Sequence, residues 1–229
     1  KIRQELDVEL KKIQESKKDK IHIGISSPAI ASFHLSKLIP YFQKSYPDIR
    51  FVITTNPGDS IEQSILKGDI DLGIMPPPLE STDLTYEVIS ECYFIMVVPT
   101  NNPLIKHAVY KEGYPFPWID IELFKNEDFI LCIPSNRTRY LSDTLMKKAK
   151  ITPKIVHLAE DSISAMQMSE MHMGISFSFS LLLEYLHYPQ NVKVFLVGDP
   201  PIESGDVVVY RKEAILSPIE KEFIALLKR

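Results

Sequence analysis

The chain has 229 residues, enough for one large domain or two small ones around a sizeable core. Hydrophobic residues make up 45% of it and charged residues 24%, as in ordinary globular proteins, and it lacks the roughly 18 consecutive apolar residues of a membrane span. A net charge of −4 argues against a nucleic-acid-binding surface on this chain itself, because phosphate contacts need clustered Lys and Arg.

Residues 1–19 are predicted to form a charged helix with one apolar stripe, made of Ile2, Leu6, Leu10 and Ile13. So short a segment cannot bury that stripe locally. We expect it to pack on another copy of the chain or on another domain; the alternative is a surface helix folded back on this domain. The segment has no signal-peptide core and the sequence starts at Lys, so we expect a processed protein or a fragment of a longer one.

Residues 20–99 alternate between strand and helix patterns. Pro40 is expected in the first turn of its helix, Asp59 or Ser60 as the N-cap of the next helix, and Gly68 as that helix's stop. The predicted strands are "KIHIGISSP", "RFVITTNPG", "DIDLGIM", "LTYEVIS" and "CYFIMVVP", and the helices are "ASFHLSKLIPYFQKSYPDI" and "DSIEQSILKG". This order predicts a parallel sheet with crossover helices.

Residues 101–118 are rich in proline and are predicted to be a loop that leads into a second lobe of the same kind. There we expect strands in "DFILCIPSN", "KIVHLAED", "ISFSF" and "VKVFLVGD", with helices in "RTRYLSDTLMKKAKI", "SISAMQMSEMHMG" and "SLLLEYLHY". The strand "DVVVYRK" can pair with either lobe, and "SPIEKEFIALLKR" is a terminal amphipathic helix. The fold class is therefore α/β, with two Rossmann-like lobes joined by a two-strand hinge as a clamshell.

The residues from 20 to 229 resemble the effector-binding domain of LysR-type transcriptional regulators, a bacterial family. The resemblance is carried by Gly24, by "KLIPYFQKSYPDI", "ILKGDIDLGI" and "FIMVVPTNNPL", and more loosely by "ELFKNEDFILCIP", "EDSISAMQMSEMHMGISF" and "DVVVYRKEAILSPIEKEFIALLK". The chain departs from the family where "MSEMHMGISFSFS" replaces a glycine- and alanine-rich segment.

The resemblance implies a type 2 periplasmic-binding-protein-like fold. Residues 1–19 would be the end of a linker helix, residues 20–99 with 206–229 would form lobe I, and residues 100–205 would form lobe II. It further implies a cytoplasmic, allosteric, DNA-binding regulator that senses a small molecule between its lobes. We expect a homodimer, with a tetramer as the alternative for the full-length regulator, no cofactor, and DNA bound by an N-terminal domain that this chain lacks.

Short polar residues stand at the ends of several predicted strands, directly before helices. In open α/β sheets ligands bind at the carboxyl ends of strands, where helix N-termini offer free N–H groups. The residues that we expect to contact the effector are Ser26, Ser27, Pro28, Thr55, Asn56, Pro57, Met75, Pro99, Thr100, Ser135, Asn136, Arg137, Ser162 and Phe177.

This set predicts a small carboxylate or similar anion, held in lobe I by Ser26, Ser27 and Asn56 and in lobe II by Ser135 and Arg137. The alternative is that these residues only cap their helices and that the arginine is a surface residue. Asp161 would repel an anion unless it faces away or the effector is also cationic. Met75 and residues 76–78, all prolines, are expected to give the site an apolar border, the alternative being a rigid surface loop.

Other chemistries find little support in the sequence. Cys92 and Cys132 lie in apolar runs and are expected to be buried thiols; a redox pair is the alternative. Met166, Met168, Met171, His172 and Met173 offer soft metal ligands, but we expect packing in the core. No nucleophile or acid–base motif is present, so we expect no catalysis. The rival readings are a solute-binding protein of a transporter and an enzyme on this fold.

Overall fold

The computed structural model describes residues 20–26, 28–56, 58–77, 83–185 and 189–228, so the helix predicted over residues 1–19 lies outside the described residues. The chain divides into two compact units: unit 1 within Lys1–Glu91 and Gly205–Arg229, and unit 2 within Cys92–Ser204. The chain crosses from unit 1 to unit 2 inside one long strand and returns inside another. The sequence placed these crossings at residues 99–100 and 205–206.

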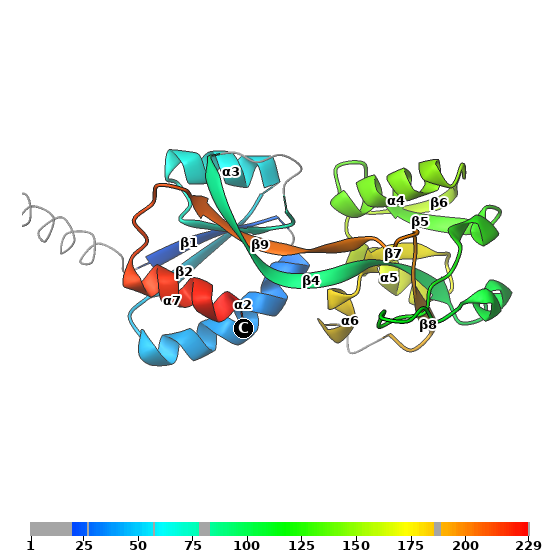
Figure 1. The fold of residues 1–229 in the computed structure, drawn as a ribbon, viewed down its shortest axis with the longest axis horizontal. Helices are drawn as coiled ribbons and strands as arrows, with labels where there is room; N and C mark the ends of the chain where they lie inside the picture. The colour runs from blue at the N-terminus through cyan, green and yellow to red at the C-terminus, as the bar shows by residue number, and fades with distance from the viewer. Residues whose placement is uncertain (1–19, 27, 57, 78–82, 186–188, 229) are drawn as a thin grey trace, which may run out of the picture. The chain divides into compact units, whose positions relative to one another are not determined.

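Unit 1 is a mainly parallel sheet with helices on both faces (Figure 1). Its elements are β1 (Lys20–Ile25), α2 (Pro28–Ser45), β2 (Arg50–Thr55), α3 (Gly58–Lys67), β3 (Leu72–Met75), the first half of β4 (Leu84–Pro99), most of β9 (Glu203–Arg211) and α7 (Pro218–Leu227). Strand β1 pairs in parallel with β2 and β3, and β9 joins β3 antiparallel. The parallel sheet with crossover helices is confirmed, and the last strand belongs to this sheet.

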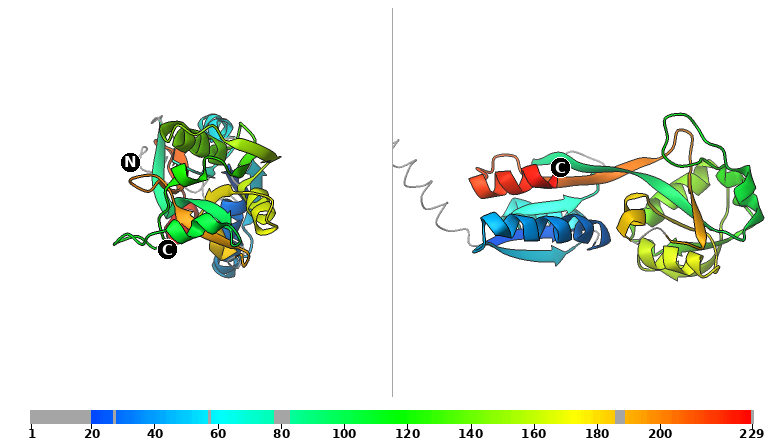
Figure 2. Two further views of the ribbon diagram at one scale, coloured as in Figure 1. Left: turned by 90° about the vertical axis from the view of Figure 1, so that its right-hand side faces the viewer. Right: turned by 90° about the horizontal axis from the view of Figure 1, so that it is seen from below.

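The two faces of this sheet bury separate apolar clusters because alternate strand residues point to opposite faces. On one face Ile23 lies with Phe42 of α2 and Phe223 of α7, helices that Figure 2 shows side by side. On the other face Ile61 of α3 packs close to the sheet. A Cβ on Gly24 would lie 3.3 Å from the Ile61 side chain, so this glycine permits the close approach of α3.

Two helix boundaries differ from the prediction. Helix α2 begins at Pro28, so Pro40 lies inside it and not in its first turn. An interior proline costs about 3 kcal/mol, which the packing of Leu35 and Phe42 from the same helix offsets. Helix α3 begins at Gly58, so Asp59 and Ser60 lie in its first turn instead of capping it. Its predicted stop is confirmed, since Gly68 follows with a φ of +83°.

Residues 84–99 form the single strand β4 where the sequence predicted two strands. The polar residues Ser90 and Glu91 do not interrupt it, because β9 lies alongside. The Asp206 N–H donates to Ser90 Oγ at 3.2 Å. A Cβ on Gly205 would lie 2.1 Å from the Ser90 carbonyl oxygen, so only glycine fits at this point.

Unit 2 contains three strand pairings around an aromatic core. Its elements are the second half of β4, the 3-10 helices η1 (Pro103–His107) and η2 (Ile121–Phe124), β5 (Asp128–Cys132), α4 (Arg137–Lys148), β6 (Lys154–Ala159), α5 (Ser162–Glu170), β7 (Ser176–Phe179), α6 (Leu181–Tyr185) and β8 (Val192–Leu196). Strands β5 and β6 are parallel, and β4 pairs antiparallel with β7 and β8. Within the described part of the chain, no helix is both long and apolar enough to cross a bilayer.

Candidate functional site

The carboxyl ends of β1, β2 and β3 meet at one edge of the unit 1 sheet. The strand register places Thr55 and Ile74 beside Ile25. Beyond the last pairs, the Ser26 N–H donates to the Ile74 carbonyl at 3.1 Å and the Asn56 N–H donates to the Ile25 carbonyl at 3.0 Å. Three predicted site residues, Ser26, Thr55 and Asn56, are thereby brought to one edge, which we call the unit 1 edge.

The hydroxyl of Ser26 is shielded from solvent and has no hydrogen-bond partner among the described residues. Leaving a buried polar group unsatisfied costs about 1–3 kcal/mol, so such groups are rare and need a reason. Helices α2 and α3 begin at this edge, at Pro28 and Gly58. Their first N–H groups and dipoles favour an acceptor or an anion there.

The other predicted residues of unit 1 have different surroundings. Met75 ends β3 but is 6% exposed and packs in the cluster of Ile61 and Ile65, so its side chain belongs to the core. Pro76 is half-buried and Pro77 is exposed. Pro28 opens α2, while the predicted contacts of Ser27 and Pro57 lie outside the described residues.

Asp206 is a buried acid at the unit 1 edge that the sequence reasoning missed. The register of β9 places its neighbour Val207 beside Met75, and only 2% of Asp206 is exposed. The Nε2 atom of His34 on α2 lies 3.8 Å from its Oδ2. In the sequence, this aspartate begins the apolar strand "DVVVY", and that position could have predicted a buried acid. A buried carboxylate needs a polar or charged partner, so such an acid is a candidate site residue.

The carboxyl ends of β5 and β6 form a second edge, the unit 2 edge, where capping uses the polar side chains. Asn136 Oδ1 accepts from the Thr138 N–H at 2.8 Å, and Nδ2 donates to the Glu160 carbonyl at 3.0 Å. Asp161 Oδ1 accepts from the Ser164 N–H at 2.8 Å. Asn136 therefore caps α4, and the Asp161 carboxylate is directed to its own helix.

The remaining predicted residues of the unit 2 edge flank these caps. Ser135 is exposed in the turn after β5. Arg137 and Ser162 are the first residues of α4 and α5, and both are half-buried. Their positions at two helix N-termini on one edge suit contact with a polar ligand.

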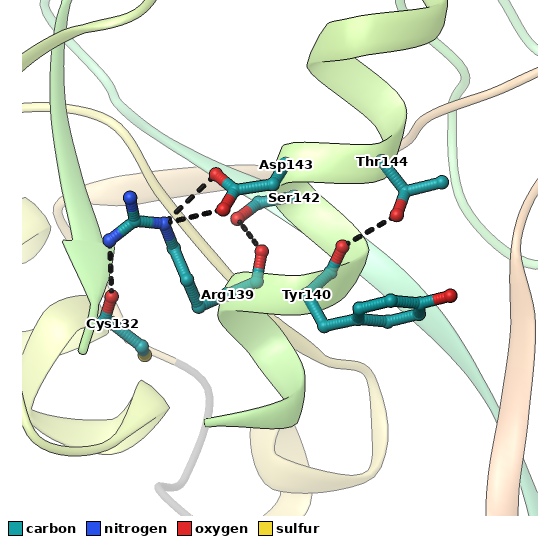
Figure 3. A network of polar contacts seen from close by, with 6 residues as sticks. All are labelled: Cys132, Arg139, Tyr140, Ser142, Asp143 and Thr144. Carbon is teal, nitrogen blue, oxygen red and sulfur yellow. Dashed lines mark hydrogen bonds and ion pairs between the residues drawn. The ribbon is translucent and has the colours of Figure 1, made fainter. Parts of the chain in front are cut away.

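A second arginine holds α4 against the end of β5 (Figure 3). Arg139 Nε donates to both carboxylate oxygens of Asp143 at 2.9 Å, and Nη1 donates to the Cys132 carbonyl at 3.1 Å. Burial, with a smaller effect of the negative Asp161, raises the pKa of the Cys132 thiol to about 11. Cys132 and Cys92 are both buried and neither forms a disulfide, which fits the expectation of buried thiols. The raised pKa leaves Cys132 unreactive at neutral pH.

Three predicted residues of unit 2 do not lie at the unit 2 edge. Phe177 is 1% exposed, and its ring stacks between Phe94 and Phe129 with centroids 5.4 and 6.1 Å away, so it is a core residue. Pro99 pairs with Val192, and the Thr100 N–H donates to Asn191. The antiparallel pairing of β4 with β7 puts both residues near the amino end of β7, opposite to the carboxyl ends of β5 and β6.

The methionine segment is only partly core. Met166 is fully buried and Met168 packs against the cluster around Ile130, as expected. Helix α5 ends at Glu170, so Met171 and Met173 leave the helical pattern and are 72% and 41% exposed. Among the described residues no group of His, Cys, Asp and Glu side chains is arranged to hold a metal ion.

Two α/β units, each with helix N-termini and polar residues at the carboxyl ends of its parallel strands, define a small-molecule-binding domain. Residues 14–229 match the family described as "LysR substrate binding domain", and the chain belongs to this family. Its fold is the type 2 periplasmic-binding-protein-like fold of LysR effector-binding domains.

Known relatives and structures agree with this assignment. The chain is 25% identical over 210 residues to YwbI, an HTH-type transcriptional regulator of Bacillus subtilis (strain 168), covering 91% of this chain and 65% of that protein. The effector-binding domain of QuiR, solved with shikimate, superposes with a TM-score of 0.71 at 23% identity, over 93% of this chain and 97% of that one. The regulatory domain of Synechocystis PCC6803 CcmR, solved with 2-PG, gives 0.75 at 19% identity, over 91% and 95%.

The chain spans just under two thirds of the length of YwbI. It is a ligand-sensing domain of the LysR type, and the relatives and structures named above are described as a transcriptional regulator and as effector-binding or regulatory domains. The regulator reading of the sequence is thereby confirmed over its two rivals.

Proposed function

We propose that the effector of this domain is a small carboxylate or similar anion that also carries a hydroxyl group. The candidate residues are Ser26 and Asn56 at the unit 1 edge, and Ser135 and Arg137 at the unit 2 edge. An arginine at a helix N-terminus receives a carboxylate in a bidentate, charge-assisted manner. Serine and asparagine side chains would bond the hydroxyl and fix its orientation.

The unsatisfied Ser26 hydroxyl is the observation that carries this proposal. A buried hydroxyl without a partner favours a bound state in which a ligand atom or a water supplies the missing bond. Shikimate, the compound found in the QuiR domain, is a hydroxylated carboxylate and serves as the first compound to try. The buried Asp206 gives the unit 1 edge an acceptor as well, which fits an effector with a donor group.

A thermal-shift screen of this chain against hydroxylated carboxylates, simple carboxylates, phosphate and sulfate tests the effector class. A ligand at about 100 times its Kd adds about 2.7 kcal/mol to the free energy of unfolding. For a domain of this size that raises Tm by several degrees. We expect a hit among the carboxylates that Arg137→Ala weakens about tenfold or more. A screen in which only uncharged compounds raise Tm would contradict the proposal.

For the whole protein we propose a cytoplasmic regulator whose N-terminal domain binds DNA. Effector binding would favour one of two arrangements of the regulator and so change how the DNA-binding domains meet their site. YwbI, described as an uncharacterized HTH-type transcriptional regulator and matched over 91% of this chain, supports this. The test is a gel-shift titration of the full-length protein at two salt concentrations. Binding should be sequence-selective and should weaken steeply with salt; its absence in a folded sample would contradict the proposal.

We further propose that this domain forms homodimers through strand edges. Strand β2 is the edge strand of the unit 1 sheet, and β6 is an edge strand of the two-stranded sheet that it forms with β5. Large apolar side chains on both are exposed: 44% of Ile53 and 58% of Leu158. Exposed apolar edges favour association. Sedimentation should show a dimer that Ile53→Lys and Leu158→Lys both weaken. Val88→Lys, at a residue also 56% exposed, is the control, and a monomeric wild type would contradict the proposal.

A further inference from the structure

The amino ends of the unit 2 strands surround a polar pocket of about 440 Å³, which lies entirely within that unit. Its polar lining residues are Asn101, Asn102, Asn126, Glu127, Asp128, Lys154 and His172, with Pro99, Met173, Gly174 and Ile175 as the apolar part. Asp128 begins β5 and Lys154 begins β6. The pocket is therefore at the opposite ends of these strands from the unit 2 edge, and its volume suits a small ligand.

Three side-chain pairs hold the walls in place, each joining segments far apart in the sequence. Lys154 Nζ lies 2.6 Å from Asp128 Oδ1. Asn102 Nδ2 donates to Glu127 Oε2 at 2.7 Å. These bonds use only part of each group's capacity, since a carboxylate has two oxygens and an ammonium three donors. Among the residues that the structure describes, the second oxygens of Glu127 and Asp128 have no bond and are available to a ligand.

His172 completes the third pair and adds a further acceptor. Its φ of +60° is in the left-handed region, which a histidine tolerates better than most residues. Its Nδ1 atom lies 3.1 Å from Asn101 Oδ1. An amide oxygen only accepts, so this contact is a hydrogen bond when Nδ1 carries a proton, and in the tautomer protonated at Nδ1 alone Nε2 is an acceptor. The His172 ring is exposed and lines the pocket.

The charged and titratable groups of the pocket thus consist mainly of acceptors. Two carboxylates face one ammonium, and that ammonium is already paired with Asp128. An anion would meet net repulsion. A ligand with an ammonium group has three N–H donors that suit the carboxylates of Glu127 and Asp128.

We propose that this pocket is a second ligand site of the domain and that it takes a small molecule bearing an ammonium group. Carbon atoms of such a ligand would lie against Met173, which is 41% exposed despite its apolar side chain. The two sites prefer opposite charges, so the proposal stands independently of the anion effector proposed for the strand-end residues.

Calorimetric titration of this chain with matched compounds tests the proposal. The ammonium-bearing probes are ethanolamine and diaminobutane, and the controls of similar shape are ethylene glycol and butanediol. We expect saturable binding of at least one ammonium compound and none of its control. Equal binding within every matched pair, or no binding of any ammonium compound, would overturn the proposal.

Variants of the pocket residues test whether the ammonium compound binds in this pocket. Glu127→Gln keeps the shape of the side chain and should weaken binding about 10- to 100-fold, as for the loss of a charge-assisted bond. His172→Asn retains a residue that tolerates a positive φ and should weaken it less. Glu112→Gln, at an exposed acid outside the pocket, should leave it unchanged. Circular dichroism checks the fold of each variant, and unchanged affinity in folded Glu127→Gln would overturn the proposal.

Discussion

The unit 1 edge and the unit 2 edge look alike in the sequence and differ in the structure. Both carry short polar residues between a parallel strand and a helix. At the unit 2 edge the Asn136 side chain donates one hydrogen bond to the backbone and accepts one from it, and the Asp161 side chain accepts one, at 2.8–3.0 Å. The hydrogen-bonding groups of these two side chains are therefore largely satisfied within the protein. At the unit 1 edge the Ser26 hydroxyl is shielded from solvent and has no partner in the described part of the chain.

This difference separates residues that stabilise the fold from residues that are available to a ligand. A capping side chain is satisfied before any ligand arrives, so its loss lowers stability. An unsatisfied buried hydroxyl costs free energy in the unliganded protein and regains it on binding. The two edges should therefore respond oppositely to the removal of their polar groups.

The largest expected effect is a pH dependence of the free energy of unfolding that comes from the buried Cys132 thiol at the unit 2 edge. The pKa of its thiol rises from 9.0 to about 11 because the group is buried, so the folded state favours the protonated form. The contribution of the protonated thiol to the free energy of unfolding is fully present below pH 9 and is lost as the pH rises to about 11. That difference corresponds to about 2–3 kcal/mol.

Urea unfolding at several pH values from 8 to 11, roughly the range over which the thiol titrates, checks this prediction. The wild type should lose more stability over that range than Cys132→Ala, which lacks the titrating group. Parallel losses in the two proteins would mean that the thiol is open to solvent and that the unit 2 edge is less closed than described.

The next effect is the loss of the α4 cap. Asn136→Ala removes the bonds to the Thr138 N–H and the Glu160 carbonyl. We expect the free energy of unfolding to fall by about 1–2 kcal/mol. Ser135→Ala, at the exposed residue just before it, should change stability by less than about 0.5 kcal/mol. Equal stability of the two variants would remove the distinction between capping and exposed residues at this edge.

The smallest effect has the opposite sign. Ser26→Ala deletes a hydroxyl that has no partner among the described residues. The variant should keep the stability of the wild type or gain up to about 1 kcal/mol, because no bond is lost and a desolvated group disappears. Chemical denaturation measures the difference. A clear loss of stability would show that the hydroxyl is already bonded in the unliganded protein.

Much of the fold could be predicted because it depends on local patterns. The alternation of Ile21, Ile23 and Ile25 predicted β1, and Gly68 marked the end of α3. The errors arose where tertiary contacts prevail over local signals. Pro40 is accepted inside α2 because the helix packs on the sheet. Ser90 and Glu91 continue β4 because β9 lies beside them.

The sites were predicted less completely, for a physical reason. A sequence shows that Ser26 and Asn136 stand before helices, but not which of them bonds its own helix, since that depends on side-chain geometry. Asp206 is buried only because β9 joins the unit 1 sheet. The polar pocket combines residues from Asn101 to His172 that share no local motif. Its residues become neighbours only through the pairing of β4, β5, β6 and β7.

The most direct test of the account is a calorimetric titration of the best carboxylate from the screen into the wild type, Ser26→Ala and Asn136→Ala. The account predicts that Ser26→Ala weakens binding about tenfold or more while its stability is retained. Asn136→Ala should bind nearly as well as the wild type while its stability falls. If Ser26→Ala bound the carboxylate with wild-type affinity, the unsatisfied hydroxyl at the unit 1 edge would have no part in sensing, and the central claim would be contradicted.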